Sequence, residues 1–236
     1  MIQEIKCSIW NKFDVVFQAN SDVNIIVGIN GSGKTTLLEN LYDDLSRTKD
    51  KATVVYLPSI DNIAIRDKRK NKNSLGQVLD YYIYDMKTGP SFMNYRMSML
   101  DADEKKQTEL KKHITRFIDI ANKYFSVSRK KIELDSNKLW AVNGKERLTT
   151  DLLSSGEKQL LLILLRIFLL ENKESYVLID EPENSLDIEW QYELLNDLVE
   201  LNPNVQFFIT THSPGIFGDG WGDKVFYMEN ITKIKE

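Results

Sequence analysis

A glycine-rich segment from Gly28 to Thr35 constrains the fold of this chain more than any other feature of its sequence. It fits the pattern G-x-x-x-x-G-K-[ST] and lies between an apolar run at 24–27 and an amphipathic stretch at 34–45. Glycines in a loop between a strand and a helix allow successive backbone N–H groups to turn inward, where they can bind phosphate groups. The segment therefore predicts a triphosphate-binding loop within an α/β fold.

The residues of this loop have different expected tasks. Lys34 is expected to contact the β- and γ-phosphates, and the Thr35 hydroxyl is expected to ligate Mg²⁺. The other expected nucleotide-binding residues are Asn30, Gly31, Ser32, Gly33 and Thr36. The alternative, a coincidental glycine-rich turn, does not explain why a strand and a helix flank the segment as the motif requires.

A second polar position follows an apolar strand expected at 176–179. This strand ends in Asp180 and Glu181, directly before Pro182. Asp180 is expected to hold Mg²⁺, directly or through water, and Glu181 is expected to polarise the attacking water as a general base. The alternative is that two acidic residues only end the strand, but the phosphate loop upstream favours a nucleotide hydrolase.

Strands alternate with helices at both ends of the chain, which predicts an α/β fold with a mostly parallel sheet. We expect one domain over 1–236, with an N-terminal antiparallel β part and the phosphate loop at 1–60. An inserted, mainly helical subdomain with a β-hairpin is expected at 61–150, and the remaining core elements at 151–236. Within the insert, His113 lies on an amphipathic stripe and is interpreted as a core residue. The expected hairpin turns at Asn143-Gly144 in a type I′ turn.

The helices outside the insert are expected at 34–45, 157–170 and 188–201, and the strands within 1–27 and at 52–57, 176–179, 205–210 and 224–228.

Composition narrows the class of protein. The single cysteine, Cys7, excludes an intramolecular disulfide and fits a reducing cytosol. The longest apolar run, 160–170, is interrupted by Arg166 and is far shorter than the ~20 residues that span a bilayer. With no secretory signal at the N-terminus, we expect a cytoplasmic protein without membrane insertion. The net charge of −4 argues against a surface that binds nucleic acid all over, and leaves a local basic patch possible.

A third small-residue turn, Leu153-Ser154-Ser155-Gly156-Glu157, precedes the long apolar helix. Such a turn can bind an anion at the helix N-terminus. By itself it is explained equally well by an ordinary N-cap, in which a serine caps the helix and Glu157 lies in its first turn.

Taken together, these motifs resemble those of the ATP-binding-cassette (ABC) ATPases. LSSGEKQ resembles the signature motif, VLIDEP the Walker B strand, 185–187 the D-loop, and TTHSP at 210–214 the switch-histidine segment. The motifs occur in family order over 23–228. The segments INGSGKTTLLENL and DEPENSLDIEWQ are similar to those of the RecF-like, SMC-like and OLD-like branch of the family. Many members of this branch act in DNA repair or phage defence.

The resemblance implies roles that the residues alone do not establish. Ser154 and Gly156 would contact the γ-phosphate bound to an opposite subunit, so that two copies enclose two ATP molecules. Ser155 and Glu157 complete this signature, which would act in trans. His212 would sense the γ-phosphate beside Glu181, giving a catalytic set of Glu181, His212 and Lys34. Asp187 would couple the two subunits.

The chain also departs from the family pattern. Ser155 replaces a common glycine, and Asp187 stands where soluble relatives often have histidine. No clear Q-loop glutamine follows the strand at 52–57, and Asn62 and Gln77 are the candidates. Trp10 and Phe13 are candidates for stacking on adenine, although aromatic residues in an N-terminal strand are more often part of a core.

The resemblance implies that ATP and Mg²⁺ close a dimer, that hydrolysis opens it, and that a partner responds to the difference. We expect an ATPase subunit of a prokaryotic phage-defence or DNA-maintenance complex with a separate effector, since little sequence follows Met228. The first alternative is a DNA-repair ATPase that binds duplex through the basic loop 66–72. The second, less favoured, is the nucleotide-binding subunit of an ABC transporter.

Overall fold

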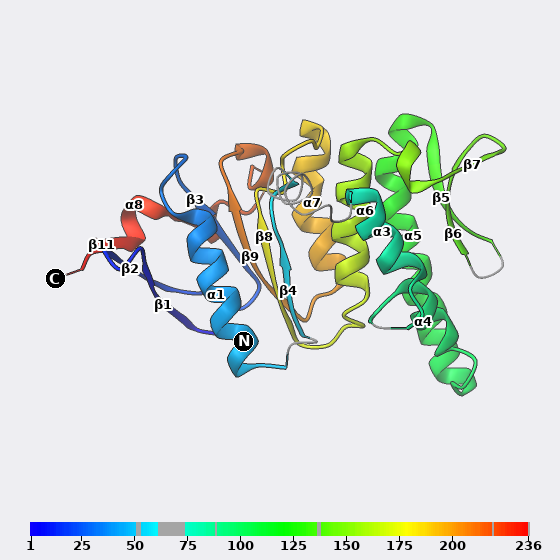
Figure 1. Ribbon diagram of the computed structural model, residues 1–236, viewed down its shortest axis with the longest axis horizontal. Coiled ribbons are helices and arrows are strands. Elements are labelled where there is room, and N and C mark those ends of the chain that lie inside the picture. Colours follow the sequence, from blue (N-terminus) through cyan, green and yellow to red (C-terminus); the bar gives the residue numbers. More distant parts are fainter. Residues whose placement is uncertain (51–52, 61–73, 88, 136–137, 219, 236) are drawn as a thin grey trace. The chain divides into compact units, whose positions relative to one another are not determined.

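The computed structural model describes residues 1–50, 53–60, 74–87, 89–135, 138–218 and 220–235 (Figure 1). The chain forms two compact units. Unit 1 contains residues 1–59 and 172–236, and unit 2 contains residues 60–171. The expected boundary at 60 coincides with the first division, but the second lies at 171 rather than 150. The helix after residue 150 therefore packs with the insert, because it contacts the helices of unit 2.

The core of unit 1 is a five-stranded parallel sheet. Its strands are β3 (Val23–Val27), β4 (Val54–Leu57), β8 (Ser175–Asp180), β9 (Val205–Thr211) and β10 (Val225–Tyr227). They lie in the order β10-β3-β9-β8-β4, and every neighbouring pair is parallel. All residues of β8 and β9 are buried, as expected for a parallel sheet covered on both faces. The expected α/β fold class is confirmed.

Two helices cover this sheet on opposite faces, α1 (Lys34–Thr48) and α7 (Ile188–Leu201) (Figure 1). The buried face of α1 consists of leucines at three- and four-residue spacing, Leu37, Leu38, Leu41 and Leu45. These leucines join β-strand side chains such as Ile26 and Phe208 in one apolar core. The first residue of α1 thereby stays beside the end of β3, which places the phosphate loop at the carboxyl edge of the sheet.

A smaller antiparallel sheet also belongs to unit 1. It contains β1 (Glu4–Ile9), β2 (Phe13–Gln18) and β11 (Thr232–Ile234), in the order β1-β2-β11. The strand expected at 224–228 ends at Tyr227, because Met228 begins the short helix α8 (Met228–Ile231) that leads into β11. Trp10 and Asn11, in the turn between β1 and β2, both have positive φ, 54° and 56°.

Unit 2 is mainly helical. Its helices are α3 (Leu75–Tyr84), α4 (Phe92–Met97), α5 (Glu104–Phe125) and α6 (Ser155–Phe168). An antiparallel sheet accompanies them, built from β5 (Lys130–Asp135), β6 (Lys138–Asn143) and β7 (Glu146–Leu148). Four 3₁₀ turns complete the described elements of the two units, at Ser126–Ser128, Thr150–Leu152, Pro214–Ile216 and Gly222–Lys224.

The hairpin between β6 and β7 is present, but its turn differs from the expected type I′ turn. Asn143 pairs with Glu146 and belongs to the strand, so the two loop residues are Gly144 and Lys145. Gly144 has φ +62°, whereas Asn143 and Lys145 have no positive φ. A two-residue hairpin loop with glycine at its first position fits a type II′ turn. The predicted turn, Asn143-Gly144, lies one residue before the observed loop, Gly144-Lys145. Gly144 can form a two-residue loop with either of its neighbours, so the sequence allows both.

Among the described helices, none combines the length with the apolar composition needed to cross a bilayer.

The interpretation of His113 as a core residue is confirmed. The side chain is 8% exposed, and its ring stacks on Phe168 with 4.4 Å between ring centroids. Its Nδ1 lies 2.8 Å from the Tyr95 hydroxyl. Burial, with smaller effects from Arg116 and Lys106, lowers the pKa of His113 to about 4. His113 is therefore neutral in the folded protein at neutral pH.

We predict that His113 makes the protein less stable to mild acid. The imidazole has a pKa near 6.5 when the chain is unfolded, so the unfolded state binds more protons between about pH 6.5 and pH 4. Lowering the pH from 7 to 4 should therefore cost about 2–3 kcal/mol more in wild type than in His113→Gln. Chemical unfolding at several pH values measures this difference. His212→Gln, which removes the other histidine, is the control, and equal pH dependence of wild type and His113→Gln would contradict the prediction.

Candidate functional site

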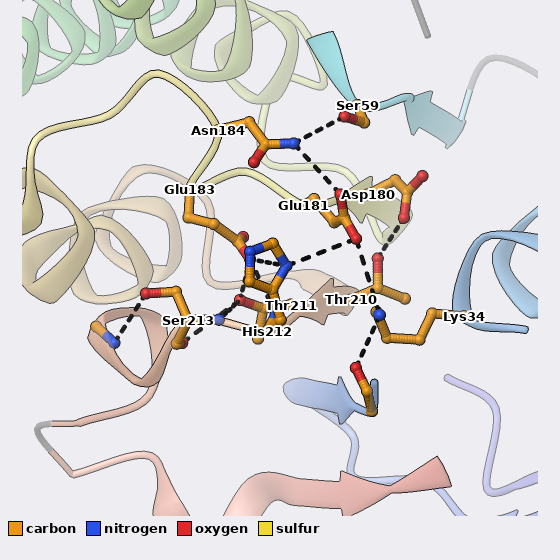
Figure 2. A network of polar contacts seen from close by, with 12 residues as sticks. Lys34, Ser59, Asp180, Glu181, Glu183, Asn184, Thr210, Thr211, His212 and Ser213 are labelled. Carbon is orange, nitrogen blue, oxygen red and sulfur yellow. Dashed lines mark hydrogen bonds and ion pairs between the residues drawn. The ribbon is translucent and has the colours of Figure 1, made fainter. Parts of the chain in front are cut away.

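The structure brings Lys34, Asp180, Glu181 and His212 together at the carboxyl edge of the parallel sheet in unit 1 (Figure 2). Thr35 lies at the same edge, because its hydroxyl donates a hydrogen bond to Asp180. Each follows from the topology. The phosphate loop connects β3 to α1, Asp180 ends β8, and His212 comes directly after β9. Because β3, β9 and β8 are adjacent and parallel, their carboxyl ends meet. Sequence positions as far apart as 35 and 180 thus lie within hydrogen-bond distance.

The phosphate loop has the backbone that its sequence predicts. Gly31 and Gly33 have φ +80° and +95°, which favours glycine. Gly33 is the N-cap of α1 and provides no side-chain cap, so N–H groups of the first turn remain available to a ligand. The Lys34 side chain is 5% exposed, and its ammonium donates to the carbonyl oxygens of Gly28 at 2.9 Å and Ile29 at 3.3 Å.

The remaining expected nucleotide-binding residues differ in exposure. Asn30 and Gly31 are exposed, whereas Ser32 and Thr36 are half-buried. Beside the loop lies a hollow of about 530 Å³, lined among others by Gly28, Ile29, His212 and Tyr227.

Asp180 is a buried carboxylate that accepts two hydroxyl hydrogen bonds. Thr35 donates to one oxygen at 2.9 Å and Thr210 donates to the other at 2.6 Å. Burial raises the pKa of Asp180, and the Glu181 charge adds to this effect, while the two threonines and Lys34 act against it. A buried carboxylate beside a threonine hydroxyl is an all-oxygen donor set, which is what Mg²⁺ prefers. The residues present therefore fit the metal that the motif implies.

Glu181 occupies a strained position. Its φ is +48°, in the left-handed region that residues other than glycine rarely adopt. Its Oε1 lies 3.8 Å from Lys34 Nζ, and its Oε2 accepts a hydrogen bond from Asn184 at 3.3 Å. The backbone N–H of Glu181 donates to Thr210 at 3.0 Å. Strain of this kind is found at functional sites, where surrounding contacts hold the side chain in place.

His212 faces two carboxylates. Its side chain is 49% exposed, and its Nδ1 lies 3.7 Å from Glu181 Oε1 and 3.3 Å from Glu183 Oε1. The expected neighbourhood of His212 and Glu181 is therefore present.

For several residues of this network, the sequence alone indicates no role. Glu183, Asn184 and Thr210 belong to the quoted segments DEPENSLDIEWQ and TTHSP, but no contact could be assigned to them. Ser59, which follows β4, accepts a hydrogen bond from Asn184 at 3.0 Å. The sequence feature that could have pointed to these residues is the high density of polar residues directly after β8. A turn at the end of a buried strand places such side chains in the site.

The signature segment lies in unit 2 and forms a helix cap. Ser154 is the N-cap of α6, its Oγ accepts from the Glu157 N–H at 3.2 Å, and Glu157 Oε2 accepts from the Ser154 N–H at 2.8 Å. This reciprocal arrangement is a capping box. Ser154 and Ser155 are exposed, and Gly156 is buried. The N-cap that the sequence left open is thus present, while a role in trans stays a prediction.

The buried Glu157 carboxylate has further partners. Lys130 donates to both of its oxygens, at 3.0 and 2.8 Å, and Ser128 donates to Oε1 at 2.7 Å. Burial would raise the pKa of Glu157, but the hydrogen bonds from Lys130, Ser128 and the Ser154 backbone outweigh it and hold the pKa below its usual range. The signature turn is therefore held both by its own capping box and by Lys130 and Ser128.

The other expected residues have varied positions. Asp187 is the exposed N-cap of α7 and makes no side-chain capping bond. Gln77 belongs to a capping box with Ser74 at the start of α3 in unit 2. Phe13 is half-buried, whereas Trp10 is 51% exposed. Asn62 and the basic loop 66–72 lie outside the described residues.

Comparison with known proteins agrees with this geometry. A family model described as "AAA domain, putative AbiEii toxin, Type IV TA system" matches residues 93–218, more than half of the chain. The matched region includes the signature segment, Asp180, Glu181 and His212.

The fold is similar to that of a solved SMC head. The crystal structure of an SMC head bound to the C-terminal winged-helix domain of ScpA aligns with a TM-score of 0.51 and 14% identity, over 95% of this chain and 96% of that one. An SMC head domain from Thermotoga maritima aligns with a TM-score of 0.45 and 16% identity, over 87% of this chain and 86% of that one. A nucleotide-free ATP-binding cassette of an ABC transporter aligns with a TM-score of 0.46 and 16% identity, over 91% of this chain and 80% of that one.

We predict that Asp180→Asn raises the thermal unfolding midpoint of the protein measured without nucleotide and metal at pH 7. A carboxylate whose pKa is raised by burial costs stability above its ordinary pKa, and an amide of the same shape removes that cost. Asp43→Asn, an exposed change on α1, is the control and should leave the midpoint unchanged. A midpoint lower than wild type would show that the charge itself stabilises the site.

Proposed function

Because the chain belongs to this AAA-domain family of P-loop ATPases, we propose that it binds ATP with Mg²⁺ at the phosphate loop and hydrolyses it to ADP and phosphate. The observation that carries the proposal is the convergence of Lys34, Thr35, Asp180, Glu181 and His212 at one sheet edge. An ammonium, metal-binding oxygens and a carboxylate base are groups that phosphoryl transfer to water uses, and the imidazole adds a polar group beside them.

Phosphate binding begins with the loop itself. The backbone N–H groups at the N-terminus of α1 would attract the β- and γ-phosphates. Lys34 already points its ammonium at carbonyl oxygens of the loop, 2.9 and 3.3 Å away, and phosphate oxygens would replace these acceptors. Thr35 and Asp180 would hold Mg²⁺, which supplies positive charge to the phosphate oxygens.

Hydrolysis needs a base near the γ-phosphate. Glu181 follows the metal-binding Asp180 directly, and its Oε1 lies 3.8 Å from Lys34 Nζ. A carboxylate oriented by Lys34 and Asn184 can accept a proton from water and direct the water at phosphorus. His212, with Nδ1 3.7 Å from Glu181, would contact the γ-phosphate from the side of β9.

We further propose that two copies enclose two ATP molecules, each signature segment acting on the nucleotide of the other copy. Three features of the turn support this. Ser154 and Ser155 are exposed, Gly156 offers no side chain at the helix start, and the Glu157 charge is compensated by Lys130. Without that compensation, a carboxylate at this turn would repel a phosphate. Asp187, exposed at the start of α7, would couple the two copies.

The proposed biological role is to drive or gate a separate effector in a prokaryotic defence or DNA-maintenance complex in the cytoplasm. The family description, which names a toxin of a type IV toxin–antitoxin system, favours defence. Direct duplex binding by loop 66–72 stays an alternative, and a transporter subunit is the less favoured one.

Trp10 is our candidate for the residue that stacks on adenine. It is 51% exposed in the turn between β1 and β2, and a Cβ placed on Gly33 would lie 3.3 Å from its Cη2. The exposed indole thus lies beside the last glycine of the phosphate loop. Phe13 is edge-on to Trp10, with ring centroids 6.1 Å apart, and supports it.

We predict that Glu181→Gln abolishes most hydrolysis and leaves ATP binding intact. Loss of a general base slows turnover by about 10²–10⁴-fold, whereas the phosphate loop and Mg²⁺ ligands are unchanged. The variant should therefore accumulate as an ATP-bound dimer, which light scattering coupled to size-exclusion chromatography detects.

Lys34→Ala is the matched control for Glu181→Gln, because it should lose ATP binding and remain monomeric. Normal hydrolysis by Glu181→Gln would overturn the assignment of the base. A monomer with ATP bound, in the presence of Mg²⁺ and without a partner chain to supply the second face, would overturn the dimer.

We also predict that Trp10→Ala weakens ATP binding by about 5- to 100-fold, the usual range for loss of one stacked base. Isothermal calorimetry on ATP and on inorganic tripolyphosphate separates the effects, because tripolyphosphate has no base to stack. Trp10→Phe should keep most of the affinity, and Trp221→Ala is the control. If both ligands lose affinity equally, Trp10 supports the loop and does not stack on adenine.

A further inference from the structure

Glu183 is a buried carboxylate between the ends of β8 and β9 that the proposed reaction does not use. Its side chain is 5% exposed. One oxygen, Oε1, accepts hydrogen bonds from the Thr211 hydroxyl at 2.7 Å and the His212 backbone N–H at 2.9 Å. The same oxygen lies 3.3 Å from His212 Nδ1 (Figure 2). The other oxygen, Oε2, is buried with no hydrogen-bond partner among the described residues.

The contacts at Nδ1 bear on which ring nitrogen of His212 carries a proton. A neutral imidazole has one N–H donor and one nitrogen lone pair. Nδ1 faces Oε1 of Glu183 and, at 3.7 Å, Oε1 of Glu181, and both are acceptors. A lone pair directed at two carboxylate oxygens would be repelled, so the arrangement favours the tautomer with its proton on Nδ1. Nε2 then carries the lone pair of the neutral ring, so His212 can donate to a γ-phosphate oxygen only after Nε2 takes up a proton.

The same geometry gives His212 a nearer carboxylate than that of Glu181. Both glutamates are within reach of one Nδ1–H, and Glu183 is 0.4 Å closer. Glu183 is also fixed by two further donors, whereas Glu181 is held by Asn184 and Lys34. At 3.3 Å, Glu183 Oε1 is the nearer acceptor for a proton on Nδ1, which leaves the Glu181 carboxylate available to its water.

We propose that Glu183 is a positioning residue that keeps the proton of His212 on Nδ1 and holds the imidazole away from Glu181. The catalytic consequence rests on the proposed ATP hydrolysis, but the tautomer of His212 does not. Glu183→Gln should preserve the effect, since all three partners of Oε1 are donors and an amide oxygen can accept from them. Glu183→Ala should remove it.

The first test is the ¹⁵N chemical shifts of the imidazole nitrogens in nucleotide-free protein near pH 8. The chain has two histidines, and His113→Gln and His212→Gln assign the signals. We expect Nδ1–H at His212 in wild type and Glu183→Gln, and a shift toward the common Nε2–H tautomer in Glu183→Ala. Glu200→Gln, an exposed change in the last turn of α7, is the control. Nε2–H in wild type, a measurement that needs no variant to fold, would overturn the proposal.

The second test is a double-mutant cycle on ATP hydrolysis. Removing a residue that orients a functional side chain typically costs about 10- to 100-fold, so we expect Glu183→Ala to lower kcat in this range with KM for ATP unchanged. In a His212→Ala background the same change should alter kcat by less than about twofold, because the two residues act as a unit. An undiminished loss in that background would indicate a merely structural role.

The two tests also separate this proposal from the proposed function. If wild type does not hydrolyse ATP, the proposed function fails, and the ¹⁵N shifts still decide whether Glu183 sets the tautomer. If wild type and Glu181→Gln behave as expected but Glu183→Ala leaves the His212 shifts unchanged, only the role of Glu183 fails.

Discussion

The site depends first on one buried carboxylate, that of Asp180. Its two oxygens accept hydroxyl hydrogen bonds from Thr35 and Thr210, which belong to α1 and β9. These bonds join α1, β8 and β9 around a side chain that is 1% exposed. A buried charge is costly unless it is hydrogen-bonded, so the two threonines are required by the position of Asp180. Its placement then determines where a metal ion and the following Glu181 lie.

The turn after β8 builds the rest of the network at some cost in backbone strain. Glu181 and Ser185 have φ +48° and +68°. Between them the chain folds back tightly, with the Asn184 N–H donating to Glu181 at 3.3 Å. This shape directs the Glu181, Glu183 and Asn184 side chains at different neighbours, namely Lys34, His212 and Ser59. The strain is maintained by these contacts, as is usual at functional sites.

The signature turn illustrates how one sequence can satisfy two physical demands. The capping box between Ser154 and Glu157 stabilises the start of α6. Lys130 and Ser128 compensate the buried Glu157 carboxylate, which reduces the repulsion that a phosphate would meet at this turn. A cap and an anion site use the same helix N-terminus, so the N-cap in the structure does not argue against the role in trans.

The sequence by itself determined the α/β class. It also predicted the phosphate loop and the site residues Lys34, Thr35, Asp180, Glu181 and His212, which the structure brings together. It could do so because strand–loop–helix spacing and residue type are local properties of the chain. It missed the turn register at Gly144 and the end of β10 at Tyr227, since neighbouring residues there allow either assignment. Only the tertiary structure decided that Glu183 faces His212, because that contact joins the ends of two strands 29 residues apart. Contacts of this kind follow from strand order, and no local pattern in the chain encodes them.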